Sequence, residues 1–264
     1  MLLLLCLLAG QASAVVELDG PLVQGGLVFG QAPQGSQAWL DGQPLMVSTD
    51  GAFLIGFGRD DTDTRTLEVV LPDGQRWSRS LRPEPRSFDI QRIDGLPGEQ
   101  VTPPPEVLQR IRDEAALARR ARERRDARTD WAAGFIWPVY GRITGVYGSQ
   151  RILNDQPRAP HWGIDIAAPT GTPVKAPAAG LVTLTRPDMY FSGGTIFVDH
   201  GHGLVSAFLH LSEILVETGQ RVDQGEVIGL VGATGRATGP HLDWRVNLGD
   251  TRVDPKLLLP PAPE

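Results

Sequence analysis

Three short segments of this 264-residue chain hold histidines that could build a metal site, and two of the segments also hold aspartate. HWGID contains His161 and Asp165, PHLDWRV contains His241 and Asp243, and LVSAFLHLS contains His210 near its end. Residues separated by an even number lie on the same face of an extended strand, so each pair can point to one side of a sheet. Three strand ends can then direct all five side chains to one point. Imidazole and carboxylate are donors that zinc takes in proteins.

The strand alternation also predicts which neighbours are turned away. In PHLDWRV the apolar Leu242, Trp244 and Val246 take the face opposite the acidic and imidazole side chains. In LVSAFLHLS the same alternation puts His210 on one face with Ser206 and Phe208.

Two other features of the same region admit a chemical and a structural interpretation. His200 and His202 in DHGHGL form a second His-x-His that could chelate a metal, but a turn between two strands explains them better. The glycine-rich stretch of Gly232, Gly235 and Gly239 lacks the Lys-Ser/Thr ending of a phosphate loop. We interpret it as a turn that presents His241.

Taken together, the motifs resemble the lysostaphin/LytM-type zinc metallopeptidases, peptidoglycan endopeptidases of the duplicated hybrid motif fold. The resemblance covers roughly residues 141–255 and runs through HWGIDIAAPTGTPVKAPAAGLV, GGTIFVDHGHGLVSAFLHLS and GQRVDQGEVIGLVGATGRATGPHLDWRV. It implies that His161 and Asp165 bind Zn²⁺ and that His210 and His241 are catalytic. The family usually has histidine as the third ligand, where this chain has Asp243.

An aspartate is chemically able to be that third ligand, since carboxylate oxygens bind zinc at about 2.0–2.2 Å. Two carboxylates would leave the metal a weaker Lewis acid than a two-histidine site. The resemblance implies a zinc-dependent endopeptidase that hydrolyses the peptide cross-links between peptidoglycan stem peptides. His210 or His241 then takes a proton from water, and activity should fall as the pH drops through about 6 to 6.5.

Two other function classes stay open on the sequence alone. The first is a catalytically inactive LytM-like domain that binds cell wall or activates a wall amidase, and the second is an adhesion or scaffold protein. Arg151 and Tyr190 flank the expected cleft and are candidate substrate contacts.

Composition and the first residues bear on location and partners. The net charge of -6 argues against nucleic-acid binding, which needs a basic face. The sequence contains no run of eighteen apolar residues, so it predicts no membrane-spanning helix. Residues 1–14, MLLLLCLLAGQASA, have the apolar core and small-residue ending of a signal peptide and contain Cys6, the single cysteine. We therefore expect an exported protein without disulfides, periplasmic or else extracellular.

The elements that must hold the motifs predict a mainly β fold in three parts. Residues 15–97 read as a small antiparallel β-sandwich, with Asp-Gly turns at 41–42, 50–51 and 73–74 and a strand at 66–71. Residues 98–133 hold an Arg-rich connecting helix from Pro105 to about Trp131. That helix is either solvated or docks to a partner, such as an amidase or a division or elongation complex. Residues 134–258 form a LytM-like antiparallel β-sheet domain before a tail at 259–264. Its expected strands are 181–186, 195–200, 204–210 and 227–231.

Overall fold

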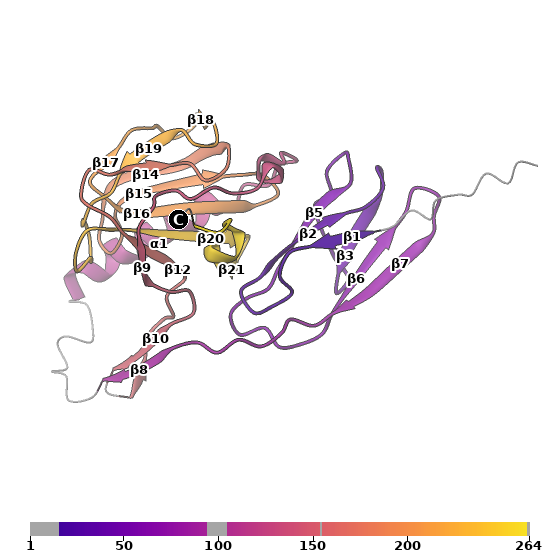
Figure 1. Ribbon diagram of the computed structural model, residues 1–264, viewed down its shortest axis with the longest axis horizontal. Helices are drawn as coiled ribbons and strands as arrows, with labels where there is room; N and C mark the ends of the chain where they lie inside the picture. Colours follow the sequence, from indigo (N-terminus) through magenta and orange to yellow (C-terminus); the bar gives the residue numbers. More distant parts are fainter. Residues whose placement is uncertain (1–15, 94–104, 154, 263–264) are drawn as a thin grey trace, which may run out of the picture.

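The computed structural model describes residues 16–93, 105–153 and 155–262, so the signal peptide predicted at 1–14 lies outside the described residues. The chain is mainly β and forms two lobes side by side (Figure 1). One lobe holds strands β1 to β7, and the other holds a large sheet with the helix α1 behind it. The predicted fold class is confirmed.

The N-terminal lobe is a small sandwich of two antiparallel sheets. Their strands are, in spatial order, β1 (Glu17–Asp19), β2 (Leu27–Gln31) and β5 (Ala52–Gly56), and β4 (Gln43–Pro44), β3 (Gln37–Leu40), β6 (Arg65–Val70) and β7 (Arg76–Leu81). The core between them includes the fully buried Phe53 and Leu67. Asp41 and Gly42 turn β3 into β4 with φ of 50° and 74°, as an Asp-Gly hairpin requires.

The C-terminal lobe has a large antiparallel sheet and a smaller one packed on it. The large sheet runs β18 (Arg221–Val222), β14 (Gly180–Met189), β15 (Gly193–Asp199), β16 (Leu204–Leu211), β20 (His241–Leu248), β12 (Gly163–Ala167) and β9 (Arg142–Gly145), with β21 (Thr251–Val253) also paired to β20. The smaller sheet runs β13 (Pro173–Lys175), β19 (Val227–Leu230) and β17 (Glu213–Ile214). Trp244 and Phe208 of the large sheet share one core with Ile228 of the smaller sheet. The four strands expected here are confirmed.

The connecting helix is shorter and less solvated than predicted. A 3-10 turn (Pro105–Val107) leads into α1 (Leu108–Arg122), and a second 3-10 turn spans Asp130–Ala133. Between them Arg128 leaves the helical path and pairs with Asp199 of the large sheet at 2.6 Å, so tertiary pairing overrides helix propensity. The face of α1 that holds Ala118 and Ala121 packs on the large sheet. Alanine is a weak hydrophobic signal, so the sequence pattern did not predict this buried face.

The two lobes share contacts that the sequence did not predict. β8 (Ile90–Ile93), expected within the sandwich, pairs in parallel with β10 (Gln150–Leu153), which also pairs with β11 (Gln156–Pro157). Parallel pairing joins segments distant in sequence, so no local pattern reveals it. The ring of Phe29 also lies 5.7 Å from that of Trp131.

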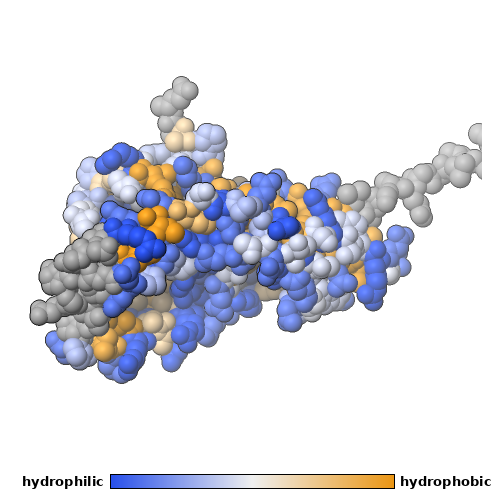
Figure 2. Space-filling model, turned by 90° about the horizontal axis from the view of Figure 1, so that it is seen from below, coloured by the Kyte–Doolittle hydropathy of each residue, from blue (hydrophilic) through white to orange (hydrophobic). Residues whose placement is uncertain are grey.

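Within the described ranges, no helix has the length and hydropathy that a membrane crossing requires. Hydrophilic side chains cover most of the face in Figure 2, and hydrophobic ones form small separate patches.

Candidate metal centre

Two antiparallel strands bring a pair of carboxylates face to face. β12 and β20 pair so that Asp165 lies directly opposite Asp243. Like charges at such a cross-strand position destabilise a sheet unless a cation lies between or beside them. The register of these strands therefore creates a cation-binding position.

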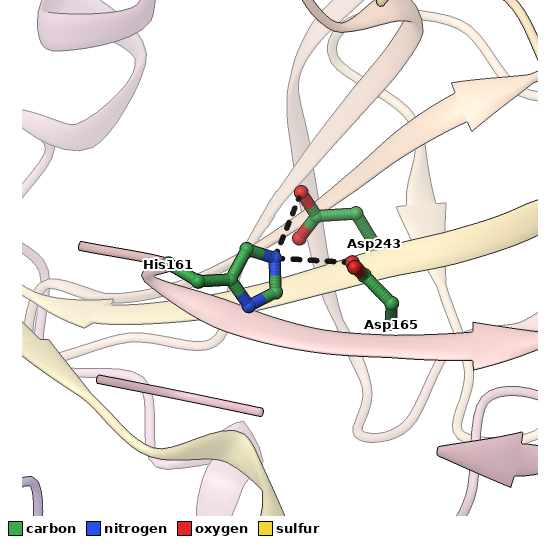
Figure 3. A group of neighbouring side chains, drawn as sticks. All are labelled: His161, Asp165 and Asp243. Carbon is green, nitrogen blue, oxygen red and sulfur yellow. Dashed lines mark ion pairs between the residues drawn. The ribbon is translucent and has the colours of Figure 1, made fainter. Parts of the chain in front are cut away.

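His161 completes the group from the segment just before β12. Its backbone N–H donates to the carbonyl of Ser149 and its own carbonyl accepts from Gly148 N–H, both at 2.8 Å. Its Nε2 lies 3.0 Å from Asp165 Oδ1 and 3.6 Å from Asp243 Oδ2 (Figure 3). These are the three residues that the sequence suggested as ligands.

The donor set fits a zinc ion. Ligand atoms in a tetrahedral site with bonds of about 2.0–2.1 Å lie about 3.3 Å apart, between the two distances from His161 Nε2. Asp165 Oδ1 is buried and makes no well-formed hydrogen bond, although His161 Nε2 is near. An acceptor left unsatisfied in this way is what a missing cation would explain. One nitrogen and two carboxylate oxygens are also ligands that zinc takes.

The two carboxylates of this centre favour positive charge beside them. Burial lowers the pKa of His161, but the carboxylates of Asp165 and Asp243 next to its Nε2 outweigh burial and raise that pKa to about 10. Burial raises the pKa of Asp243, but Arg245 and His161 hold it far below its ordinary value. The site therefore attracts cations strongly.

Arg245 is a member of this centre that the sequence analysis missed. Its guanidinium contacts both oxygens of Asp243, with Nε at 3.0 and 3.1 Å and Nη2 at 2.5 Å. The signal was present, because residues 243 and 245 are two apart on one strand and must share a face.

His210 and His241 stand beside the three ligands, with ring centroids 4.8 Å apart. His210 Nδ1 lies 2.8 Å from the carbonyl of Thr234, and His241 Nδ1 lies 2.8 Å from the carbonyl of Gly239. A carbonyl only accepts, so each Nδ1 carries a proton, and the neutral form of either ring has its lone pair on Nε2. His241 Nε2 also lies 3.8 Å from Asp165 Oδ1. Burial lowers the pKa of His210, which favours the neutral ring.

The face predicted for His210 is wrong, because its backbone leaves the strand alternation. Phe208 lies in the core, and Ser206 is buried against His200. His210 has a φ of 66°, a left-handed conformation that is uncommon outside glycine. It turns the ring to His241 and away from the core face, and such strain is typical of functional sites.

The two candidate substrate contacts have different positions. Tyr190 follows β14 and lines a shallow pocket with Arg110, Gly193 and Thr234, the residue that holds His210. Its backbone N–H donates to Glu114 Oε2 of α1 at 2.8 Å. Arg151 lies on β10, in the small sheet with β8 and outside the large one.

The remaining motifs have structural roles, as predicted. His200 N–H donates to the carbonyl of Leu204 at 2.8 Å, and Gly201 and Gly203 in this turn have φ of 90° and 75°. The glycine-rich stretch bonds to His241, whose N–H donates to the carbonyl of Gly232 at 3.1 Å.

Comparison with known proteins places these residues in context. Residues 159–255 match the model of peptidase family M23. Over 219 residues the chain is 34% identical to the peptidoglycan DD-endopeptidase ShyA of Vibrio cholerae. The aligned region covers 77% of this chain and 50% of ShyA. Over 127 residues the chain is 39% identical to the DD-carboxypeptidase/endopeptidase Mpg of Neisseria meningitidis, covering 48% of this chain and 29% of Mpg.

A solved structure is similar over both lobes. A putative peptidase M23 from Pseudomonas aeruginosa superposes with a TM-score of 0.67 at 34% identity, over 89% of this chain and 94% of that one. The chain spans about half the length of ShyA and less than a third of Mpg.

Proposed function

The chain belongs to peptidase family M23, and we therefore propose that it is a zinc-dependent endopeptidase that hydrolyses the peptide cross-links of peptidoglycan. The observation that carries the proposal is the convergence of His161, Asp165 and Asp243 beside His210 and His241, whose Nδ1 atoms each face a backbone carbonyl. The name of ShyA, a peptidoglycan DD-endopeptidase, supplies the substrate class.

His161, Asp165 and Asp243 would hold the metal. A zinc ion bound there supplies Lewis acidity, which lowers the pKa of water and polarises a scissile carbonyl. His161 must then give up its proton, while the two carboxylates keep their charge. The metal would also give a partner to Asp165 Oδ1, a buried atom without a hydrogen bond.

His210 and His241 are proposed to handle protons and charge. One Nε2 would accept a proton from the attacking water, and the other ring, which must then be protonated on both nitrogens, would donate a hydrogen bond to the developing oxyanion or a proton to the leaving amine. The carbonyls of Thr234 and Gly239 hold the neutral form of each ring in the tautomer that leaves Nε2 unprotonated. Because burial lowers the pKa of His210, it remains a base below pH 6.5, and the loss of activity in acid should begin lower than an ordinary histidine predicts.

Substrate is proposed to lie along the face that these side chains share. Tyr190 is held next to this face by Glu114, so its ring can contact the stem peptide. The contact proposed for Arg151 would need a substrate that extends to the small sheet of β8 and β10.

Digestion of purified peptidoglycan, with released muropeptides as the readout, tests the proposal. We expect the protein to remove cross-linked dimers and His210→Ala to lose about 100- to 10,000-fold in rate while it keeps its zinc. His202→Asn is the matched control, since this histidine lies in a structural turn with a φ of 50° that asparagine tolerates. If the zinc-loaded protein releases nothing, the catalytically inactive alternative is correct.

Export to the periplasm is part of the same proposal, because peptidoglycan lies outside the cytoplasm. The leader-like sequence of residues 1–14 supports it. Any contact with an amidase or a division complex would use the outward side of α1, where Arg112, Arg119 and Arg120 are exposed. Fractionation of cells that produce the tagged protein tests the location.

A further inference from the structure

Asp243, the candidate third ligand, carries a negative charge that a neutral histidine would not. Arg245 lies next to it and can offset that charge. The side chain of Asp243 is 3% exposed, whereas that of Arg245 is 33% exposed. A buried carboxylate without a partner is costly, and a guanidinium that contacts both of its oxygens makes charge-assisted hydrogen bonds, which are stronger than those between neutral groups. The two residues therefore form one unit on the face of β20.

The charges around the metal position can be counted directly. A centre of neutral His161 with Asp165 and Asp243 has a charge of -2, which Arg245 reduces to -1. A centre of two neutral histidines and one aspartate also has a charge of -1. Arg245 thus restores the charge that the replacement of histidine by aspartate would change.

The Arg245 contacts leave room for a metal on Asp243. An ionised carboxylate has about four lone-pair positions, and the Arg245 N–H groups make one contact with Oδ1 and two with Oδ2, so the remaining position is on Oδ1. Oδ2 also lies 3.6 Å from His161 Nε2, so this oxygen faces the ligand group while it accepts from the guanidinium (Figure 3). Ligating carboxylates are commonly held by hydrogen bonds of this kind.

We propose that Arg245 is a positioning residue for the metal, and that the Asp243–Arg245 pair acts as a neutral ligand in the place of a histidine. This inference rests on the zinc site of the proposed function. It also revises the sequence-based expectation that two carboxylates would weaken the Lewis acid, because one of the two charges is already cancelled.

The test is a double-mutant cycle on zinc affinity, measured by competition with a chelator. Arg245→Gln should weaken zinc binding by about 10- to 100-fold, as loss of a ligand's hydrogen-bond partner does. Asp243→His should weaken it at least about tenfold, since Arg245 is then an unpaired cation beside the metal. The double variant Asp243→His/Arg245→Gln should recover to within about tenfold of the parent, because its charge is again -1.

Two further variants serve as controls. Arg245→Lys keeps the charge but not the two-pronged geometry, and we expect an affinity between those of the parent and Arg245→Gln. Arg65→Gln removes an arginine from the Arg65–Asp41 pair of the N-terminal lobe and should leave zinc affinity unchanged.

The possible results distinguish a failure of the role proposed for Arg245 from a failure of the proposed zinc-dependent function. If Arg245→Gln binds zinc as tightly as the parent or more tightly, Arg245 competes with the metal and the inference is overturned. The same holds if the double variant binds no better than Asp243→His. If the parent itself binds no zinc, the proposed function fails, and the inference fails with it.

Discussion

The buried ring of His200 should make the stability of this protein sensitive to mild acid. Its Nδ1 lies 2.7 Å from the carbonyl of Ala179 and its Nε2 lies 2.8 Å from Ser206 Oγ. The neutral ring satisfies both contacts, since Nδ1–H donates to the carbonyl and Nε2 accepts from the hydroxyl. Complete burial opposes the charged form and lowers the pKa of His200 to about 4.

The sign and size of the effect follow from linkage. The unfolded chain takes up a proton on this histidine near pH 6.5, and the folded protein does so only near pH 4. The contribution of His200 to stability is therefore complete above pH 6.5 and is lost as the pH falls from 6.5 to 4. At about 1.4 kcal/mol per pH unit, the full loss is about 3 kcal/mol.

Urea unfolding between pH 7.5 and pH 4.5, in the parent and in His200→Asn, measures this contribution. Asparagine keeps a donor for the Ala179 carbonyl but has no proton to gain, so the parent should lose about 2–3 kcal/mol more than the variant over this range. Burial raises the pKa values of Asp126 and Asp130, but their arginine partners lower them below the ordinary value. The stability that these two carboxylates contribute is therefore lost only below pH 4.5. Equal pH profiles for the two proteins, or a parent that gains stability toward pH 4.5, would refute the reasoning.

Three other changes have defined outcomes. Trp131→Ala removes a buried ring that packs on Phe29 of the other lobe and should lower the free energy of unfolding by about 3–5 kcal/mol; a loss below about 1 kcal/mol in urea melts would show that the lobes do not depend on it. Gly145→Ala would put a Cβ 2.1 Å from Asp165 Oδ2, so zinc affinity should fall at least about tenfold, and unaltered affinity would contradict the ligand role of Asp165. Removal of zinc by a chelator should abolish peptidoglycan hydrolysis and, when free zinc had been 1,000 times its Kd, lower stability by about 4 kcal/mol; a chelator-resistant activity would point to another mechanism.

The motifs of the C-terminal lobe could be predicted from the sequence because their signals are local. Strand alternation puts His241 and Asp243 on one face, and the structure has them there, with Asp243 opposite Asp165. Asp41-Gly42 likewise fixes a hairpin through the positive φ that these residues tolerate. Signals of this kind lie within a few residues of one another.

The errors arose where distant segments meet. The helix ends at Arg122 instead of near Trp131, because Arg128 finds its partner in Asp199, a residue 71 positions later. β8 leaves the sandwich for β10 because the exposed edge of that strand offers backbone hydrogen bonds.

The sequence by itself determined the residue types of the centre and the strands that hold them, since composition and spacing fix which donors exist and which face each one takes. Only the tertiary structure decided that His210 turns toward His241, because a left-handed residue breaks the alternation on which sequence reasoning depends. It also decided that Arg245 contacts the buried Asp243, since alternation places two side chains on one face but does not say which partners burial will force together.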